Sequence, residues 1–255
     1  MLFAIDIGNT KIALGVFEGE KLRTTLRIAT GLHRLADEYA ALLFNLLPHH
    51  GIAVKEIKEA IICSVVPPLV PVFEELCRHY LGVSPLMVEA GVKTGVRLRM
   101  DSPREVGADR VVNAAAAYQL YGGPGIVIDF GTATTFDVIS KEGDYLGGAI
   151  APGMEIAAEA LFLRSAKLPR VELIPPKQAI GKNTVTAMQS GVIFGYKGLV
   201  EGLVAQLSEE IDGKPRVIAT GGYAELIAQQ TPVIEIVNPH LTLIGLRLIY
   251  GLNRR

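Results

Sequence analysis

The sequence repeats one short motif, and this repeat constrains the fold more than any other feature. In both copies an apolar run is followed by an aspartate, one further apolar residue, a glycine and a threonine. The aspartates are Asp6 and Asp129, which lie 129 − 6 = 123 positions apart. Each copy continues with a second apolar run and an acidic glycine turn, which is typical of a strand, a tight turn and a hairpin. The chain is therefore predicted to contain two related α/β halves.

The residues around Asp129 suit an anion-binding turn. The apolar run 126–128 predicts a buried strand, and Gly131 permits tight backbone geometry immediately after it. A carboxylate repels a phosphate unless a cation lies between them, so we interpret the motif as a phosphate turn whose aspartate holds hydrated Mg²⁺ or another cation. An ordinary strand end with a Gly/Thr turn is the alternative. The second copy favours the phosphate interpretation, because two such turns can hold a polyphosphate from both ends.

Composition favours a small-molecule ligand. The 255 residues are 49% hydrophobic, and 25 basic and 26 acidic residues give a net charge of −1. Because the charges are interspersed, we expect no nucleic-acid partner and no anionic-membrane surface. The first predicted strand starts at Leu2, which leaves no room for a signal peptide, and the apolar run 241–252 is shorter than the roughly 20 residues of a membrane span. We expect a soluble cytoplasmic protein with no membrane partner.

Hydrophobic spacing predicts an α/β order in both halves. We place the boundary near the glycine-rich stretch 121–125, which gives an N-terminal half of residues 1–121 and a C-terminal half of residues 122–255. Each half is expected to form a mixed sheet with helices on its faces. Beyond the two hairpins, helices are predicted over 35–46, 69–81, 103–121, 154–163, 185–211, 224–230 and from about 239, with strands over 60–66, 86–88, 145–150, 217–220 and 233–237.

The helical pattern that begins at Pro103 places Asp109 and Arg110 on a first turn, after the flexible stretch 90–103. Unpaired N–H groups and the helix dipole favour an anionic guest at such a position. The plainer interpretation is that Asp109 offsets the dipole and that Arg110 is its surface partner. The sequence pattern leaves both interpretations open.

Two other features precede or lie within the long helix predicted over 185–211. Thr184 is either the cap of that helix or a hydroxyl directed into a cleft. Glycines recur along the helix and permit close approach of another helix, within the monomer or across a dimer. These glycines are Gly191, Gly195, Gly198 and Gly202.

Three motifs together resemble a known superfamily. Residues 6–10, 129–132 and 220–222 are similar, in this order, to the phosphate-1, phosphate-2 and adenosine elements of the actin and sugar-kinase ATPases. With residues 103–114, 131–137 and 241–246 included, the chain resembles type III pantothenate kinases over essentially residues 1–252. The resemblance implies two ribonuclease H-like (actin-like) halves with a nucleotide cleft between them.

The resemblance also implies an activity and the residues that perform it. We expect ATP-dependent phosphorylation of pantothenate to 4′-phosphopantothenate, the first step of coenzyme A synthesis, by a homodimer that uses Mg²⁺ and a monovalent cation, K⁺ or NH₄⁺. Asp109 is expected to be the general base and Asp129 to hold the monovalent cation. The predicted ATP-binding residues are Asp6, Ile7, Gly8, Asn9, Thr10, Lys11, Ile12, Ala13 and Thr132, and the predicted pantothenate-binding residues are Gly107, Ala108, Asp109, Arg110 and Thr184.

The sequence departs from the family pattern at Met100, where many members carry a tyrosine, and Lys11 is not a fixed residue of the family. Met100 can pack against the methyl groups of pantothenate but donates no hydrogen bond. Two alternative functions are a kinase for another small hydroxylated acceptor and a catalytically inactive accessory or regulatory protein of the same fold. The presence of Asp6, Asp109 and Asp129 favours an active kinase.

Overall fold

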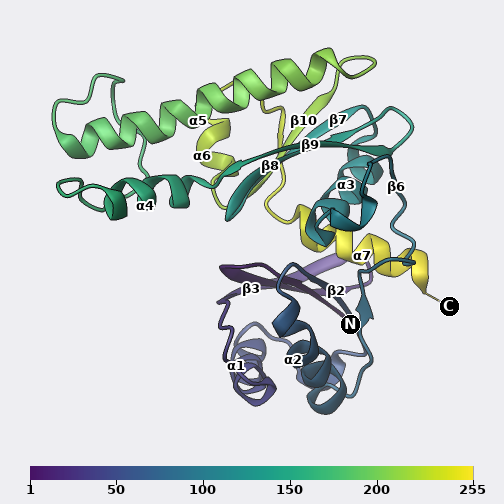
Figure 1. Cartoon of the computed structure of the whole chain (residues 1–255). Coiled ribbons are helices and arrows are strands. Elements are labelled where there is room, and N and C mark those ends of the chain that lie inside the picture. Colours follow the sequence, from purple (N-terminus) through teal and green to yellow (C-terminus); the bar gives the residue numbers. More distant parts are fainter. Residues whose placement is uncertain (255) are drawn as a thin grey trace. The chain divides into compact units, whose positions relative to one another are not determined.

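The computed structural model describes residues 1–254, which form two compact units (Figure 1). The first unit comprises Met1–Val96, Ser102–Ala116 and the chain from Leu241 onward, and the second comprises Arg97–Asp101 and Ala117–His240. These units differ from the predicted halves because the last helix packs in the first unit and a short strand near residue 97 joins the second. The predicted boundary between residues 121 and 122 lies close to one of the points where the chain passes between units.

The first unit contains a five-stranded mixed sheet in the order β3-β2-β1-β4-β5. Strand β1 pairs antiparallel with β2 and parallel with β4, and β2 pairs antiparallel with β3. The strands are β1 (Leu2–Ile7), β2 (Lys11–Glu18), β3 (Lys21–Ala29), β4 (Glu59–Ser64) and β5 (Leu86–Met87). The helices of this unit are α1 (Ala36–His49), α2 (Val70–Glu75), which continues as a π-helical segment over Leu76–Tyr80, the first part of α3 (Ala108–Tyr121), and α7 (Leu241–Asn253).

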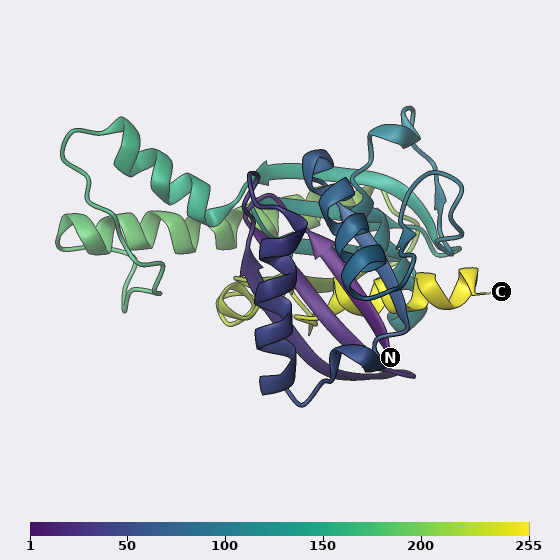
Figure 2. The same cartoon turned by 90° about the horizontal axis from the view of Figure 1, so that it is seen from below.

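Both faces of the first sheet are buried. Alternate residues of β1 point to opposite faces, so Phe3 and Ile5 pack in the core that includes α1 and α2, which lie across the sheet in Figure 2. Leu2 and Ala4 pack on the other face, in the core formed with α7 and the first part of α3. This double burial explains why β1 and β4 read as continuous apolar runs in the sequence.

The second unit contains a six-stranded sheet in the order β11-β10-β7-β8-β9-β6. The central strands repeat the pairing of the first sheet, because β7 is antiparallel to β8 and parallel to β10. The strands are β6 (Arg97–Leu98), β7 (Gly125–Phe130), β8 (Ala133–Ile139), β9 (Asp144–Pro152), β10 (Arg216–Gly221) and β11 (Ile236–Val237), and the helices are α4 (Met154–Arg164), α5 (Thr184–Glu209) and α6 (Ala224–Ala228). Helices α4 and α5 extend together beyond the edge of this sheet (Figure 1).

The structure contains the predicted helices and strands in the predicted order; it differs at several element boundaries and has one additional short strand. Helix α3 begins at Ala108, and the preceding Pro103–Glu105 forms a separate 3₁₀ turn. The stretch 90–103, predicted as a loop, contains the two-residue strand β6. The last strand is also short, because only Ile236–Val237 of the predicted 233–237 pairs with β10. Within residues 1–254, no helix is both long and apolar enough to cross a lipid bilayer.

Candidate functional site

The first repeated turn joins β1 to β2. Asp6 is half-buried near the end of β1, and its Cα is paired with Ala13 of β2 and Cys63 of β4. The Gly8 N–H donates to the Lys11 carbonyl at 3.1 Å, and a Cβ on Gly8 would lie 2.9 Å from the same oxygen. A side chain at position 8 therefore requires the turn to widen.

The predicted ATP-binding residues divide into two groups by exposure. Ile7 and Ile12 are fully buried in the sheet core, so any contact that they make with a nucleotide uses their main-chain atoms. Residues 9–11 are exposed at the tip of the turn. Thr30 directly follows β3, and its hydroxyl donates to the Gly8 carbonyl at 2.6 Å. This bond holds the start of the turn in place. The exposed tip thus presents an amide, a hydroxyl and an ammonium group on a rigid support.

The first turn of α3 holds the predicted substrate-binding residues. As expected, Asp109 and Arg110 lie on this turn, and the Gly107 carbonyl accepts the Arg110 N–H at 3.1 Å. Asp109 Oδ1 accepts the same N–H at 2.8 Å. A Cβ on Gly107 would lie 2.5 Å from Asp109 Oδ1, so the glycine leaves the space that the carboxylate occupies.

Burial gives the Asp109 carboxyl an unusual affinity for protons. Its pKa is raised above the ordinary value of 3.8, chiefly by desolvation, although the backbone N–H and the charge of Arg110 act in the opposite direction. A carboxylate with a raised pKa is a stronger base than an exposed one, which suits proton abstraction at neutral pH.

Cys63 connects this carboxylate with the β1–β2 turn. The thiol is fully buried, and its pKa is raised well above 9.0 by burial and then by the charges of Asp6 and Asp109. The influence of both carboxylates on one sulfur places Asp6 and Asp109 in the same part of the first unit. This arrangement could not be read from the sequence, because a cysteine in an apolar strand carries no signal of what lies beside it.

The second repeated turn joins β7 to β8 in the other unit. The Cα of Asp129 is paired with Thr135 of β8 and Thr220 of β10, so hydroxyl-bearing residues flank it on both sides. Gly221 has φ +91°, and a Cβ there would lie 2.6 Å from Asp129 Oδ1. Gly221, the last residue of β10, therefore leaves room for this carboxylate.

Thr132 is exposed at the tip of the second turn, and its carbonyl accepts the Gly153 N–H at 3.1 Å. A Cβ on Gly153 would lie 2.2 Å from that carbonyl oxygen. The start of α4 thus packs directly against the turn. Asp129, Thr132 and the end of β9 form one continuous local structure.

Of the two interpretations of Thr184, the structure does not support the helix cap. Asn183 is the cap, since its Oδ1 accepts the Thr186 N–H at 2.9 Å, and Thr184 is the first helical residue. Asparagine accepts this bond as well as threonine does, so the sequence pattern did not fix the cap to one position. Thr184 lines a hollow of about 580 Å³ beside α4 together with Leu161, Leu168, Gly181, Lys182, Asn183, Ala187, Met188 and Gly191.

The glycines along α5 face open space. Among the described residues, no atom lies within 4 Å of a Cβ built at Gly191, Gly195, Gly198 or Gly202. Of the two possibilities raised by the sequence, close packing of another helix within the chain is therefore not seen. Large apolar side chains are also exposed on α4, the loop that follows it and the start of α5: Ile156, Leu161, Leu163, Ile174, Ile180 and Val185.

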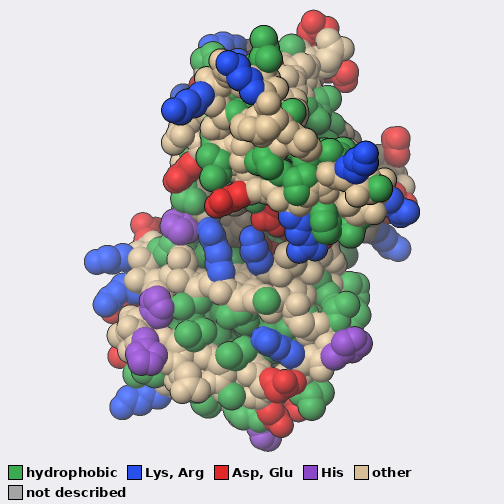
Figure 3. Space-filling view, turned by 90° about the vertical axis from the view of Figure 1, so that its left-hand side faces the viewer, with side chains coloured by type: hydrophobic (Ala, Val, Ile, Leu, Met, Phe, Trp, Pro, Cys, Tyr) green, Lys and Arg blue, Asp and Glu red, His purple; other side chains and the backbone are tan. Residues whose placement is uncertain are grey.

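The predicted site residues thus form three local groups. Residues 6–13 and 107–110 lie in the first unit near Cys63, Asp129 and Thr132 lie at the β7–β8 turn, and Thr184 lies at the start of α5. On the face shown in Figure 3, Lys and Arg side chains occur in small groups among acidic and hydrophobic ones. The first group combines a basic carboxylate with an exposed turn, and the second combines a carboxylate with hydroxyls.

Comparisons with known proteins identify the fold and the family. This chain resembles the crystal structure of a Campylobacter jejuni protein that is described as a Baf family transcriptional activator. The alignment covers 98% of each of the two chains, with a TM-score of 0.63 and 20% identity. The inorganic polyphosphate/ATP-glucomannokinase of Arthrobacter sp. strain KM aligns over 99% of each chain, with a TM-score of 0.51 and 15% identity. At these identities the likenesses show the fold alone, which is the expected actin-like α/β fold of the sugar kinases.

Sequence comparison is more specific. A family model for type III pantothenate kinase matches residues 2–206. A type III pantothenate kinase from Roseiflexus sp. (strain RS-1) is 56% identical over 254 residues, which covers 100% of both chains. The chain belongs to the type III pantothenate kinase family.

Proposed function

We propose that this protein transfers the γ-phosphoryl group of ATP to the primary hydroxyl of pantothenate, which gives 4′-phosphopantothenate and begins coenzyme A synthesis. The observation that carries the proposal concerns the Asp109 carboxylate. Burial raises its pKa, and it lies on the first turn of α3, near the Asp6 turn. Family membership supports the choice of pantothenate and ATP as substrates.

Asp109 acts as the general base. The hydroxyl oxygen of pantothenate attacks the γ-phosphorus, its proton passes to the Asp109 carboxylate, and the bond between the γ-phosphorus and the bridging oxygen breaks to release ADP. The Arg110 N–H that binds Asp109 Oδ1 fixes the orientation of the carboxylate. Positioning and charge stabilisation supply most of the catalysis in such a transfer, so a rigid base suits it.

Arg110 is proposed to bind the carboxylate of pantothenate. A guanidinium matches a carboxylate with two parallel N–H donors, and Arg110 follows the base directly in the chain. Gly107, Ala108 and Thr184 are proposed to complete the pantothenate site. Gly107 has the clearest support, because only glycine leaves space for the Asp109 carboxylate.

Residues 6–13 are proposed to contact the ATP phosphates. The exposed tip, Asn9 to Lys11, offers amide, hydroxyl and ammonium donors, and the tight Gly8 turn holds its backbone close to the ligand. Thr132 is proposed to contact the nucleotide from the second turn. Mg²⁺ would neutralise phosphate charge during the transfer, as in other phosphoryl-transfer enzymes.

Asp129 is proposed to hold the monovalent cation, K⁺ or NH₄⁺. A carboxylate oxygen is a ligand that a hard cation prefers, and Gly221 leaves space beside Asp129 Oδ1, while Thr135 and Thr220 are its neighbours on the adjacent strands. The residues present therefore suit the group. When bound, the cation would supply positive charge between the aspartate and the phosphates.

A homodimer is also proposed, and the localisation in the cytoplasm stays a prediction. The open glycine face of α5 and the exposed apolar residues of α4 support association with a second copy. Of these residues, Leu161 and Gly191 line the same hollow as Thr184, so a second copy placed there would lie next to a proposed pantothenate-binding residue.

The test is ADP release by the purified protein with ATP and Mg²⁺, with and without pantothenate, in K⁺ and in Na⁺ buffer. We expect release that requires pantothenate and is faster in K⁺, with a product heavier than pantothenate by one phosphoryl group. Turnover of a different hydroxylated acceptor in a substrate panel would favour the other-kinase alternative. ATP binding without turnover of any acceptor would favour the regulatory alternative.

A further inference from the structure

Strand β6 is a short piece of chain attached to the edge of the second sheet. Residues 97–101 belong to the second unit, whereas the residues on both sides of them belong to the first. Arg97 and Leu98 pair in parallel with Asp144 and Tyr145 of β9, and the Arg99 N–H donates to the Tyr145 carbonyl at 2.8 Å. So short a pairing provides few backbone bonds to hold the segment in place.

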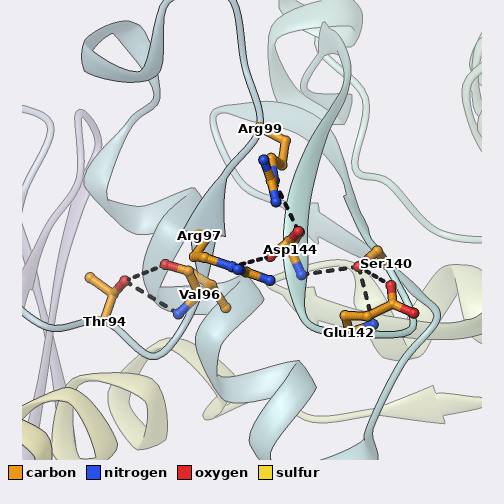
Figure 4. A network of polar contacts seen from close by, with 7 residues as sticks. All are labelled: Thr94, Val96, Arg97, Arg99, Ser140, Glu142 and Asp144. Atoms are coloured by element: carbon orange, nitrogen blue, oxygen red, sulfur yellow. Dashed lines mark hydrogen bonds and ion pairs between the residues drawn. The ribbon is translucent and has the colours of Figure 1, made fainter.

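Side chains reinforce this attachment at Asp144 (Figure 4). Arg97 Nε donates to Asp144 Oδ1 at 2.7 Å, and Arg99 Nε donates to Oδ2 at 3.0 Å. The Asp144 side chain is only 12% exposed, whereas those of Arg97 and Arg99 are 70% and 61% exposed. Each carboxylate oxygen thus receives its own arginine, and we call these three residues the Asp144 clasp.

The backbone of Asp144 is itself fixed by the turn between β8 and β9. The Ser140 hydroxyl accepts the Asp144 N–H at 3.1 Å, and the Ser140 N–H donates to the Asp144 carbonyl at 2.8 Å. Gly143, with φ +87°, packs so closely against Tyr118 that a Cβ would lie 2.4 Å from its ring. The carboxylate therefore projects from a rigid support toward the arginines.

The internal repeat shows that the clasp is an addition to the second half. Strand β9 starts at Asp144 and β3 starts at Lys21, and these residues are separated by the same 144 − 21 = 123 positions as the repeated aspartates. In the first sheet β3 is the edge strand, and the described residues form no strand beyond it. The common fold therefore does not require β6 or its arginines.

The attached segment immediately precedes, in the sequence, the chain that carries the proposed pantothenate-binding residues. Met100 follows Arg99 and lies over Gly147 of β9, where a Cβ would come within 2.9 Å of its sulfur. The chain then runs from Asp101 through the 3₁₀ turn to Gly107. On the other side of β6, Asn253 Oδ1 accepts the Lys93 N–H at 3.1 Å and its amide donates to the Lys93 carbonyl at 2.8 Å. Along the chain, the clasp thus lies between the Lys93–Asn253 contact and the Gly107–Arg110 segment.

We propose that Asp144 is a positioning residue for pantothenate binding: by holding Arg97 and Arg99 it fixes β6, and with it the chain that carries Gly107 to Arg110. The proposal rests on the function proposed above. Exposed ion pairs alone contribute little to stability, so the main consequence of losing the clasp is local freedom of residues 97–107 rather than unfolding.

The test compares Asp144→Asn and the charge-keeping Asp144→Glu with wild type. The matched control is Glu18→Gln, which breaks the exposed Glu18–Arg23 ion pair of the first unit. For Asp144→Asn we expect faster amide hydrogen exchange over residues 97–107 and an almost unchanged melting temperature. The KM for pantothenate is expected to rise by about three- to tenfold. The KM for ATP is expected to stay within about twofold of wild type. Asp144→Glu is expected to recover part of both effects, and Glu18→Gln to show neither.

Three results would overturn the proposal. Unchanged exchange over residues 97–107 would show that the clasp does not hold the segment, and faster exchange with an unchanged pantothenate KM would show that the segment does not position the substrate. Equal increases in both KM values with a lower melting temperature would make Asp144 a general stability residue, which also refutes the proposal. The exchange measurement needs no substrate. A wild-type protein that fails to phosphorylate pantothenate would therefore refute the proposed function separately.

Discussion

The two halves of the molecule share one fold but carry different groups at the same place. Strands β1 and β7 have the same pattern of buried and half-buried positions, and each is followed by a hairpin and a parallel partner. The turn after β1 spans residues 8–11 between the paired Ile7 and Ile12. The turn after β7 spans only residues 131–133 between the paired Phe130 and Thr134. Duplication of the topology has therefore not preserved the length of the phosphate turn.

The residues beside the two aspartates differ as well. Asp6 is paired with Cys63, and the charge of Asp109 also raises the pKa of that thiol. Asp129 is paired with Thr220. A helix with the proposed base is part of the first unit, and the second unit offers hydroxyls around its aspartate. The roles proposed above therefore differ between the units: proton transfer by Asp109 in the first and cation binding by Asp129 in the second. Four experiments test this proposed division, and they follow in order of expected effect.

Asp109→Asn is expected to lower kcat by roughly 10²–10⁴-fold, because the amide keeps the shape but accepts no proton. Wild-type kcat/KM should also fall at low pH, as the carboxylate is protonated below its raised pKa, and this acidic limb should disappear in the variant. Steady-state kinetics across pH measure both effects. A variant with near-normal kcat would show that Asp109 is only a helix-start residue and that the first half lacks the base.

The same variant should not lose stability at neutral pH. The folded-state pKa of Asp109 is raised above 3.8, which means that the folded protein favours the protonated carboxyl. The contribution of Asp109 to stability is therefore complete below about pH 4 and is lost as the pH rises through the raised pKa. Asparagine has no charge to bury, so the variant should become more stable relative to wild type as the pH rises through that range. Chemical denaturation at pH 4 and pH 7 checks the sign of the difference.

Asp129→Asn is expected to raise the K⁺ concentration needed for half-maximal activity by roughly 10–100-fold, since an amide replaces an anionic ligand poorly. The apparent KM for ATP should rise with it. Asp6→Asn in the other half is the matched control and should raise the KM for ATP while leaving the K⁺ response unchanged. An unaltered K⁺ titration in Asp129→Asn, or an equal shift in both variants, would remove the proposed division between the halves.

Gly8→Ala should be harmful where Gly131→Ala is nearly neutral. A Cβ at Gly8 would meet the Lys11 carbonyl at 2.9 Å, and such overpacking typically costs about 1–3 kcal/mol. At Gly131 the nearest atom is the Ala133 carbonyl oxygen at 3.5 Å, which is ordinary contact. Thermal unfolding and the KM for ATP should therefore change mainly for Gly8→Ala. Equal effects at both positions would show that the two turns are equivalent after all.

Arg110→Lys sharpens the comparison within the first half by separating recognition from catalysis. The variant keeps the charge but loses the two-donor geometry, and we expect about a tenfold rise in the KM for pantothenate with little change in kcat. Wild type should discriminate strongly against pantothenol, which lacks the carboxylate, and the variant should discriminate less. Additive effects of the substitution and of the missing carboxylate would assign Arg110 to supporting the loop around Asp109 instead.

The sequence predicted the parts of the fold that depend on local periodicity. The repeated motif, the central strands and most of the helices were expected, because double burial and helical spacing leave clear apolar patterns. The shared order of the two sheets agrees with the predicted relationship between the halves. Asp109 and Arg110 were also correctly placed on a first turn, although their roles stay predictions.

Features that depend on contacts distant in sequence were not predictable. Strand β6 has only two residues within a loop-like stretch, and its partner Asp144 lies 144 − 97 = 47 positions beyond Arg97. The assignment of α7 to the first unit was not predicted, because nothing in the apolar pattern of this helix indicates which sheet it covers. The influence of Asp6 and Asp109 on Cys63 likewise arises only when β1, β4 and α3 are brought together.

The placement of α7 also has a consequence for synthesis on the ribosome. This helix is made last, yet Leu243, Leu246 and Ile249 fill the core on one face of the sheet whose strands are made first. While residues 117–240 are being translated, that face has no α7 to cover it, and Leu2, Ala4 and Ile61 lack their final neighbours. The first unit therefore completes this core only after residues 117–240 have been translated, and until then one apolar face of its sheet lacks the helix that covers it.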